Sequence, residues 1–245
     1  MEFVLVFFIM ILGGVVQGMC GFGAGLVCMS ILPFIIDYKI ALPIMFAASL
    51  VISGQLVIKS FKHINWRVFL MPAIFSLLGR SFTILAVNNL DSTILKLILG
   101  GIIIGTAIYQ MTGANKIKIK PTHKNGAIAG ILSGLMGGLA STGGPPLVVY
   151  YMNSELEKEE YLGTLQMTFF FGAILSISLT AATGGYSGGV WKYVIVAAVG
   201  IFSGALVGRR IFDKISIQQL KKIINILLIV LGSSLLIKTL IGIIG

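Results

Sequence analysis

The chain has 245 residues, of which 57% are hydrophobic and 11% charged, and its mean hydropathy is +1.02. This composition leaves too little polar surface to enclose an apolar core in water, which excludes a soluble fold. The net charge of +10 is carried by Lys and Arg in short loops between apolar segments, as is typical of the cytoplasmic loops of membrane proteins. We therefore expect membrane lipids, and no nucleic acid, as partners of this positive charge.

The apolar runs are long enough to cross a membrane. A hydrocarbon core of about 30 Å takes about 20 helical residues, and runs of that length can be counted along the chain. The count predicts an all-α polytopic membrane protein with eight hydrophobic segments. These segments cover residues of about 3–36, 40–58, 66–87, 93–112, 125–153, 161–182, 190–208 and 219–244.

The first and fifth segments are too long for one straight crossing, and a glycine-rich stretch interrupts each of them. The stretches are residues 17–25 and 141–146. Glycine permits irregular backbone, and Pro145-Pro146 removes two successive amide donors, so both segments are predicted to be broken helices. The alternative is that the glycines serve only close helix packing, as small residues elsewhere in the chain are expected to do.

The second half of the sequence resembles the first. An offset of 125 residues pairs Trp66 with Trp191, and an offset of 116 pairs Gly14 with Gly130, which indicates a duplication with about nine extra residues near the second break. We divide the chain into an N-terminal repeat at 1–112, a basic cytoplasmic linker at 113–124 and a C-terminal repeat at 125–245, which together form one membrane transport domain.

Loop charges favour one orientation of these repeats. If all eight segments cross the membrane, Lys and Arg in the loops divide almost evenly between the two sides. If the first and fifth segments are instead re-entrant hairpins, only Lys39, Lys96, Lys192 and Lys238 lie opposite the other basic loop residues. We therefore predict inverted repeats with both chain ends outside, and parallel repeats remain the alternative.

The two breaks are the predicted binding site. Irregular backbone at membrane depth survives only where it is buried in protein or lines a watery cavity, and the free amides and positive ends of half-helices favour an anion. Ser141 and Thr142 add hydroxyl donors, and Gln17 adds an amide. The candidate substrate-binding residues are Gln17, Cys20, Gly21, Phe22, Gly23, Gly25, Arg80, Ser141, Thr142, Gly143, Gly144, Pro145 and Gln166.

Arg80 is the basic residue placed deepest in a predicted crossing segment. It is either the counter-ion of a transported anion, or it snorkels to a head group or bonds a helix C-terminus. Its repeat mate at an offset of 125 is Ala205, so symmetry does not decide between these. Gln166 is either a polar ligand in the sixth segment or a hydrogen-bonding link between helices.

The acidic residues lie at the ends of the apolar segments or between them. Proton relays and sodium sites generally use Asp or Glu at membrane depth, so we expect no coupling ion bound by a protein carboxylate. Facilitated diffusion, exchange, a carbonyl-bound ion or a protonated substrate remain open. Cys20 and Cys28 lack the Cys/His cluster of a metal site, and catalytic pairs are missing at depth, so no metal, cofactor or enzymatic activity is expected.

Residues 126–153 closely resemble the second-half signature of the TauE/SafE sulfite exporter family, most specifically in Gly143-Gly144-Pro145-Pro146-Leu147. The first half resembles the opening motif of this family, with Gly14 to Gly25 followed by Pro33. The resemblance implies a plasma-membrane secondary transporter, often an exporter, of small sulfur-containing anions such as sulfite, sulfonates and sulfoacetate, or of small organic acids.

Two other kinds of membrane protein fit the same pattern. An anion channel would share the helix-end sites but would need a continuous pore. A permease subunit would depend on a separate ATPase. The expected partners are a small anionic substrate and membrane lipids, and a second copy of the chain is a further candidate.

Overall fold

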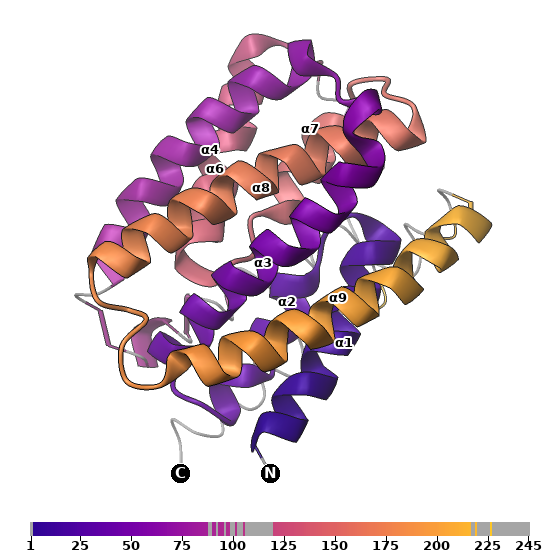
Figure 1. The fold of residues 1–245 in the computed structure, drawn as a ribbon. Helices are drawn as coiled ribbons and strands as arrows, with labels where there is room; N and C mark the ends of the chain where they lie inside the picture. Colours follow the sequence, from indigo (N-terminus) through magenta and orange to yellow (C-terminus); the bar gives the residue numbers. More distant parts are fainter. Residues whose placement is uncertain are drawn as a thin grey trace.

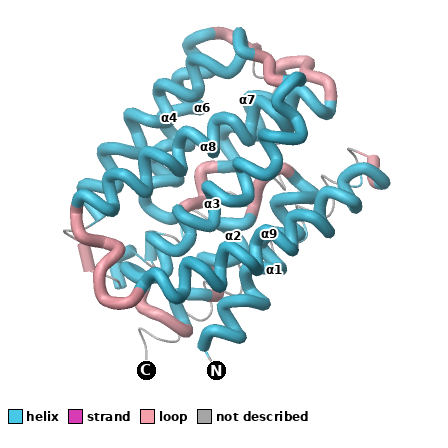
Figure 2. The backbone as a smooth tube through the Cα atoms, in the orientation of Figure 1, coloured by secondary structure: helices cyan, strands magenta, loops and turns pink. Residues whose placement is uncertain are grey.

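The computed structural model describes residues 2–87 and 120–216, together with isolated positions from 90 to 105 and at 219 and 226. This part of the chain is helical and contains no strand (Figure 2). The helices are α1 (Glu2–Cys20), α2 (Ala24–Met29), α3 (Tyr38–Ser60), α4 (Trp66–Val87), α6 (His123–Ala140), α7 (Gly144–Met152), α8 (Lys158–Ala182) and α9 (Val190–Lys214), with 3-10 turns at Leu32–Phe34 and Phe61–His63.

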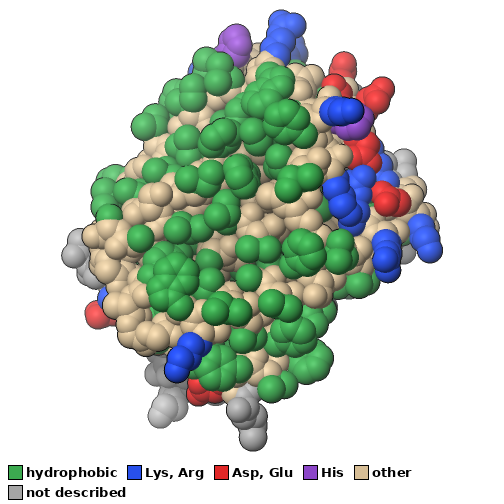
Figure 3. Space-filling view, in the orientation of Figure 1, with side chains coloured by type: hydrophobic (Ala, Val, Ile, Leu, Met, Phe, Trp, Pro, Cys, Tyr) green, Lys and Arg blue, Asp and Glu red, His purple; other side chains and the backbone are tan. Residues whose placement is uncertain are grey.

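Five of the described helices, α1, α3, α4, α8 and α9, are long and apolar enough to cross a membrane. Their outer faces expose large apolar side chains such as Ile58, Phe82 and Ile195, and charged side chains gather toward the ends of the molecule (Figure 3). The prediction of an all-helical, multi-pass membrane protein is therefore confirmed. The predicted segments 93–112 and 219–244 lie largely outside the described residues.

The first and fifth apolar segments are interrupted at their glycine-rich stretches. Helix α1 ends at Cys20 and α2 begins at Ala24, with Gly21 and Gly23 at φ values of +78° and +109°, which favour glycine. Helix α6 ends at Ala140, and Ser141 follows at a φ of +56°. Figure 2 accordingly shows non-helical backbone inside the bundle as well as at its ends.

Pro145 and Pro146 have a local explanation that the sequence argument missed. Gly143 is the N-cap of α7, so both prolines fall in the first helical turn. Amide groups in that turn have no intrahelical acceptor, and proline costs nothing there. The two prolines therefore start α7, and their missing amide donors are not evidence for a bound ligand.

Each broken segment packs against the last described helix of the other half of the chain. Helix α1 lies along α9, and α6 lies along α4, while α3 and α8 contact each other between these pairs (Figure 1). Gly79 of α4 approaches the backbone of α6 so closely that an added Cβ would lie 2.7 Å from the Ile131 carbonyl oxygen. Gly204 of α9 makes the equivalent approach to the Ile11 carbonyl of α1.

These contacts correct the predicted alignment of the two halves. Gly204 follows Gly79 by 125 positions, as predicted, but Ile131 follows Ile11 by 120. Ala140, the last residue of α6, likewise follows Cys20, the last residue of α1, by 120. The offset of 116 is therefore wrong by about one helical turn. The extra residues of the second half lie in the connection from α8 to α9 and not near the second break.

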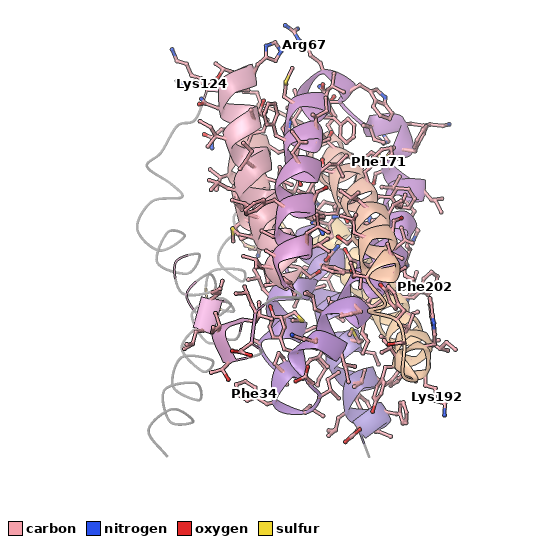
Figure 4. All side chains as sticks on the ribbon, turned by 90° about the vertical axis from the view of Figure 1, so that its left-hand side faces the viewer. Phe34, Arg67, Lys124, Phe171, Lys192 and Phe202 are labelled. Carbon is pink, nitrogen blue, oxygen red and sulfur yellow. The ribbon has the colours of Figure 1, made fainter. Side chains whose placement is uncertain are left out.

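Each break joins two helices into a hairpin, α1–α2 in the first half and α6–α7 in the second. These two hairpins open toward opposite ends of the molecule. Glu2, at the start of α1, accepts a hydrogen bond from Tyr193 at the start of α9, at 2.7 Å. Lys158, which follows α7, donates to the Phe212 carbonyl near the end of α9, at 2.6 Å. Figure 4 places Phe34 and Lys192 at one end and Arg67 and Lys124 at the other.

Replacing Gly79 or Gly204 with Ala should lower the melting temperature by several degrees. In each case the new methyl group would meet a backbone carbonyl that cannot move without parting two helices, and overpacking of this kind costs about 1–3 kcal/mol. Thermal unfolding in detergent measures the effect. Gly101→Ala is the control, because an added Cβ there has no described neighbour within 4 Å. Equal melting temperatures of all three variants would contradict the close approach of α4 to α6 and of α9 to α1.

Candidate functional site

A pocket lies where the two breaks meet, bordered by α3, α4 and α8. It is deep in the bundle, since Arg80 is 5% exposed and Thr142 is 2% exposed. Of the predicted residues, Gln17, Phe22, Gly23, Gly25, Arg80, Ser141, Thr142, Gly143 and Gly144 line this pocket. Cys20, Gly21, Pro145 and Gln166 do not belong to its lining.

The two breaks are in direct contact. A Cβ on Gly25 would lie far closer to the Ser141 carbonyl oxygen than 3.0 Å, and one on Gly144 would lie 2.8 Å from the Phe22 ring. The first break therefore fits against the second because both contain glycine at the crossing point. This contact brings residues from the two halves of the chain to one pocket.

The second break is closed by hydrogen bonds that end α6. The Ser141 N–H donates to the Gly137 carbonyl at 2.9 Å. The Thr142 hydroxyl donates to the Met136 carbonyl at 3.3 Å, so this predicted ligand donor already caps the helix. Gly143 and Gly144 follow at the start of α7, where backbone N–H groups lack intrahelical acceptors. Their amides are the better candidate donors for an anion.

Arg80 brings a positive charge to the pocket from the side of α4. Its Nη1 donates to the Ser176 Oγ at 2.9 Å and makes a long contact of 3.5 Å with the Gly137 carbonyl. Its Nε has no hydrogen-bond partner in the described part of the chain. Residues 2–87 and 120–216 also contain no acidic side chain in a salt bridge with Arg80.

The surroundings of Arg80 decide between its predicted roles. The guanidinium is held between Gly137 of α6 and Gly172 of α8, and a Cβ at Gly172 would lie 3.0 Å from Nε. Snorkelling to a head group is therefore wrong, because the side chain is buried in the bundle. The predicted contact with a helix C-terminus is present at Gly137, in the last turn of α6, and it coexists with a place in the pocket wall.

Gln166 of α8 holds the first break in place. Its Nε2 donates a short hydrogen bond to the Gly21 carbonyl, and its Oε1 accepts from the Gln17 Nε2 at 3.3 Å. Gln17 lines the pocket, whereas Gln166 stands behind it. The structure thus gives Gln166 the role of a link between helices that also positions a pocket residue.

Replacing Gln166 with Leu should lower the melting temperature of the protein. The substitution leaves the Gly21 carbonyl and the Gln17 amide without partners, at a cost of about 1–3 kcal/mol for a buried unsatisfied group. Gln55→Leu on α3 is the control, since the Gln55 Oε1 has no partner among the described residues. Thermal unfolding of both variants measures the difference. Equal melting temperatures of Gln166→Leu and Gln55→Leu would contradict the role of Gln166 as a link that holds the first break.

Sequence reasoning missed Leu26, Ser49 and Phe169, which also line the pocket. Ser49 and Phe169 lie near the middle of α3 and α8, where no break or charge draws attention to them. They are 120 positions apart, so the corrected alignment of the two halves pairs them. The same offset pairs the other residues of α3 with residues of α8, so the alignment alone would not have singled them out.

The described residues contain no group of three or more His, Cys, Asp or Glu side chains that could hold a metal ion. What the pocket offers is one buried guanidinium, backbone amides at the start of α7 and the Gln17 amide. The guanidinium and the backbone N–H groups are hydrogen-bond donors, and the guanidinium is positively charged, which suits a small anion.

Comparisons with known proteins agree with this architecture. Residues 6–235 match the family model described as sulfite exporter TauE/SafE. The chain is 31% identical over 263 residues to a probable membrane transporter protein of Methanocaldococcus jannaschii, with 94% of this chain and 96% of that protein covered. No solved structure matches. This multi-pass membrane transporter therefore belongs to the sulfite exporter TauE/SafE family.

Proposed function

We propose that the chain is a secondary transporter of small anions, most of all sulfur-containing ones such as sulfite and sulfonates, which bind in the pocket between the two breaks. The observation that carries the proposal is the buried Arg80, which lines the pocket and has no acidic partner among the described residues. The family description names sulfite export, and the length of the match supports a substrate of that chemical class.

The electrostatics of the pocket favour an anion over a cation or a neutral solute. A buried charge without an acidic partner costs several kcal/mol, and a bound anion would offset that cost. The start of α7 adds a partial positive charge and amide donors to the same lining. A sulfite or sulfonate could accept from both groups at once, because oxyanions have several acceptor oxygens.

Transport also requires access from both sides, and we propose that two inverted repeats provide it. The opposite openings of the α1–α2 and α6–α7 hairpins support this arrangement. Arg67, Lys124, Arg209 and Arg210 would face the cytoplasm, while the start of α1 and Lys192 would lie outside. The orientation follows from the excess of basic residues at the end where α4 and α6 begin.

Counterflow in proteoliposomes tests the proposal. Vesicles loaded with unlabelled sulfite should take up radiolabelled sulfite faster than unloaded vesicles, and sulfonates should compete. A channel would instead give single-channel currents without stimulation from the opposite side. Absence of uptake for sulfite, sulfonates and carboxylates by folded protein would contradict anion transport.

A further inference from the structure

A second cavity lies between the central pocket and the end of the molecule where α9 begins. Lys39 of α3 belongs to its wall, together with Ile84 and Val87 of α4 and with Thr180 and Thr183 at the end of α8. Lys39, Thr180 and Thr183 are the polar side chains of a lining that is otherwise formed by apolar side chains and glycines.

Arg80 lies one helical turn from this cavity. Ile84 follows Arg80 by four positions on α4, and Thr180 follows Ser176, the hydrogen-bond partner of Arg80, by four positions on α8. Residues four apart on a helix lie on the same face, about 6 Å along the axis. Gly138, which also lines the cavity, is next to Gly137, which touches the guanidinium. Arg80 thus separates the outer cavity from the central pocket.

The equivalent region in the other half of the molecule is filled. The counterparts of Lys39 and Ile84, by the offsets of 120 and 125, are Glu159 and Arg209, which form an ion pair at 2.7 Å. The counterpart of Thr180 is Ser60, whose carbonyl would lie 2.7 Å from a Cβ on Gly163. The positions that correspond to Lys39 and Ile84 therefore form an ion pair in the other half.

We propose that the outer cavity is a second site for small oxyanions, the external vestibule from which an anion passes Arg80 to the central pocket. The proposal rests on the proposed function and its orientation. Lys39 attracts the anion at the mouth, and the Thr180 hydroxyl and the Arg80 guanidinium mark the route inward. The Glu159–Arg209 ion pair closes the cytoplasmic side in the state that the structure describes.

Labelling of single cysteines tests the vestibule without requiring transport. The background is the full chain with Cys20→Ala and Cys28→Ala, since both native cysteines are buried. Two single cysteines report on the cavity, Thr180→Cys and the more exposed Thr183→Cys. Lys192→Cys shows whether the end of the molecule where α9 begins faces outside. Ser60→Cys, at the counterpart of Thr180, is the matched control in the other half. The probes are membrane-impermeant anionic and cationic methanethiosulfonates, added outside intact cells.

We expect external labelling at 180, 183 and 192 but not at 60. The anionic reagent should react at 180 about fivefold faster than the cationic one, as a nearby positive charge in a solvated site produces, and Lys39→Gln should reduce that preference, with Arg80 accounting for the remainder. Methanesulfonate, a sulfonate that does not react with thiols, disulfides or the reagents, should slow the reaction at 180. External labelling at 192 without any at 180 and 183, or equal rates for both reagents, would overturn the vestibule.

The outcomes also separate this inference from the proposed function. Anion-selective labelling at 180 without counterflow of any anion would leave the cavity as an anion site and refute transport. Counterflow of sulfite with cavity cysteines that are unreactive from outside would keep transport and refute the vestibule. Labelling at 180 and 192 only from the cytoplasmic side would refute the external position of the cavity.

Discussion

Replacing Arg80 with Gln is expected to weaken anion binding roughly 10- to 100-fold, because the anion loses its charged hydrogen-bond donor in the pocket. The concentration of sulfite that gives half-maximal counterflow should rise by that factor. The half-maximal sulfite concentration of Arg80→Lys should lie between those of the unsubstituted protein and Arg80→Gln. Lysine keeps the positive charge but lacks the paired donors of a guanidinium, which suit an oxyanion.

Arg67→Gln is the matched control, since Arg67 is an exposed arginine on the same helix. It should leave half-maximal counterflow unchanged. Loss of binding in Arg80→Gln should not reflect loss of fold, because the substitution removes a buried charge that has no acidic partner among the described residues. The melting temperature should therefore not fall. An unchanged sulfite affinity in Arg80→Gln would refute the role of Arg80 as counter-ion.

Replacing Gly25 with Ala should disrupt the crossing of the two breaks. The added methyl group would collide with the Ser141 carbonyl, which is backbone and cannot turn aside as a flexible side chain would. Overpacking costs about 1–3 kcal/mol, and separating the breaks would also displace the Gly143 and Gly144 amides. We expect a melting temperature lower by several degrees and transport reduced by about tenfold or more.

Gly101→Ala again serves as the control, because the same change there meets no described atom within 4 Å. Thermal unfolding and sulfite counterflow of the two variants should be compared in parallel. Full stability and transport in Gly25→Ala would mean that the two breaks do not need to touch, contrary to the geometry of the pocket.

The sequence predicted the breaks well because their signal is local. Glycine at Gly21 and Gly23 permits backbone angles that other residues avoid, and a stretch too long for one crossing must be interrupted somewhere. Most of the residues proposed from this reasoning do line the pocket. Arg80 could be singled out as well, since an arginine in an apolar segment needs a compensating environment.

Other parts of the site depend on contacts between distant segments. Nothing near Gln166 in the sequence indicates that its amide reaches Gly21, and an apolar helix gives no sign that Ser49 and Phe169 face a pocket. The alignment at 116 failed because glycines recur every four residues along α1 and α6, so a shift of about one turn preserves most matches. The packing of Gly79 and Gly204, together with the ends of α1 and α6, fixes the register.

Locating a bound anion by anomalous diffraction is the most direct test of the account. Selenite has the shape and charge of sulfite and contains a strong anomalous scatterer. Crystals grown with selenite should show a peak between the Arg80 guanidinium and the Gly143–Gly144 backbone. The contradicting result is a protein that transports selenite but shows the anomalous peak elsewhere in the molecule, with the pocket empty. The two breaks would then not hold the substrate.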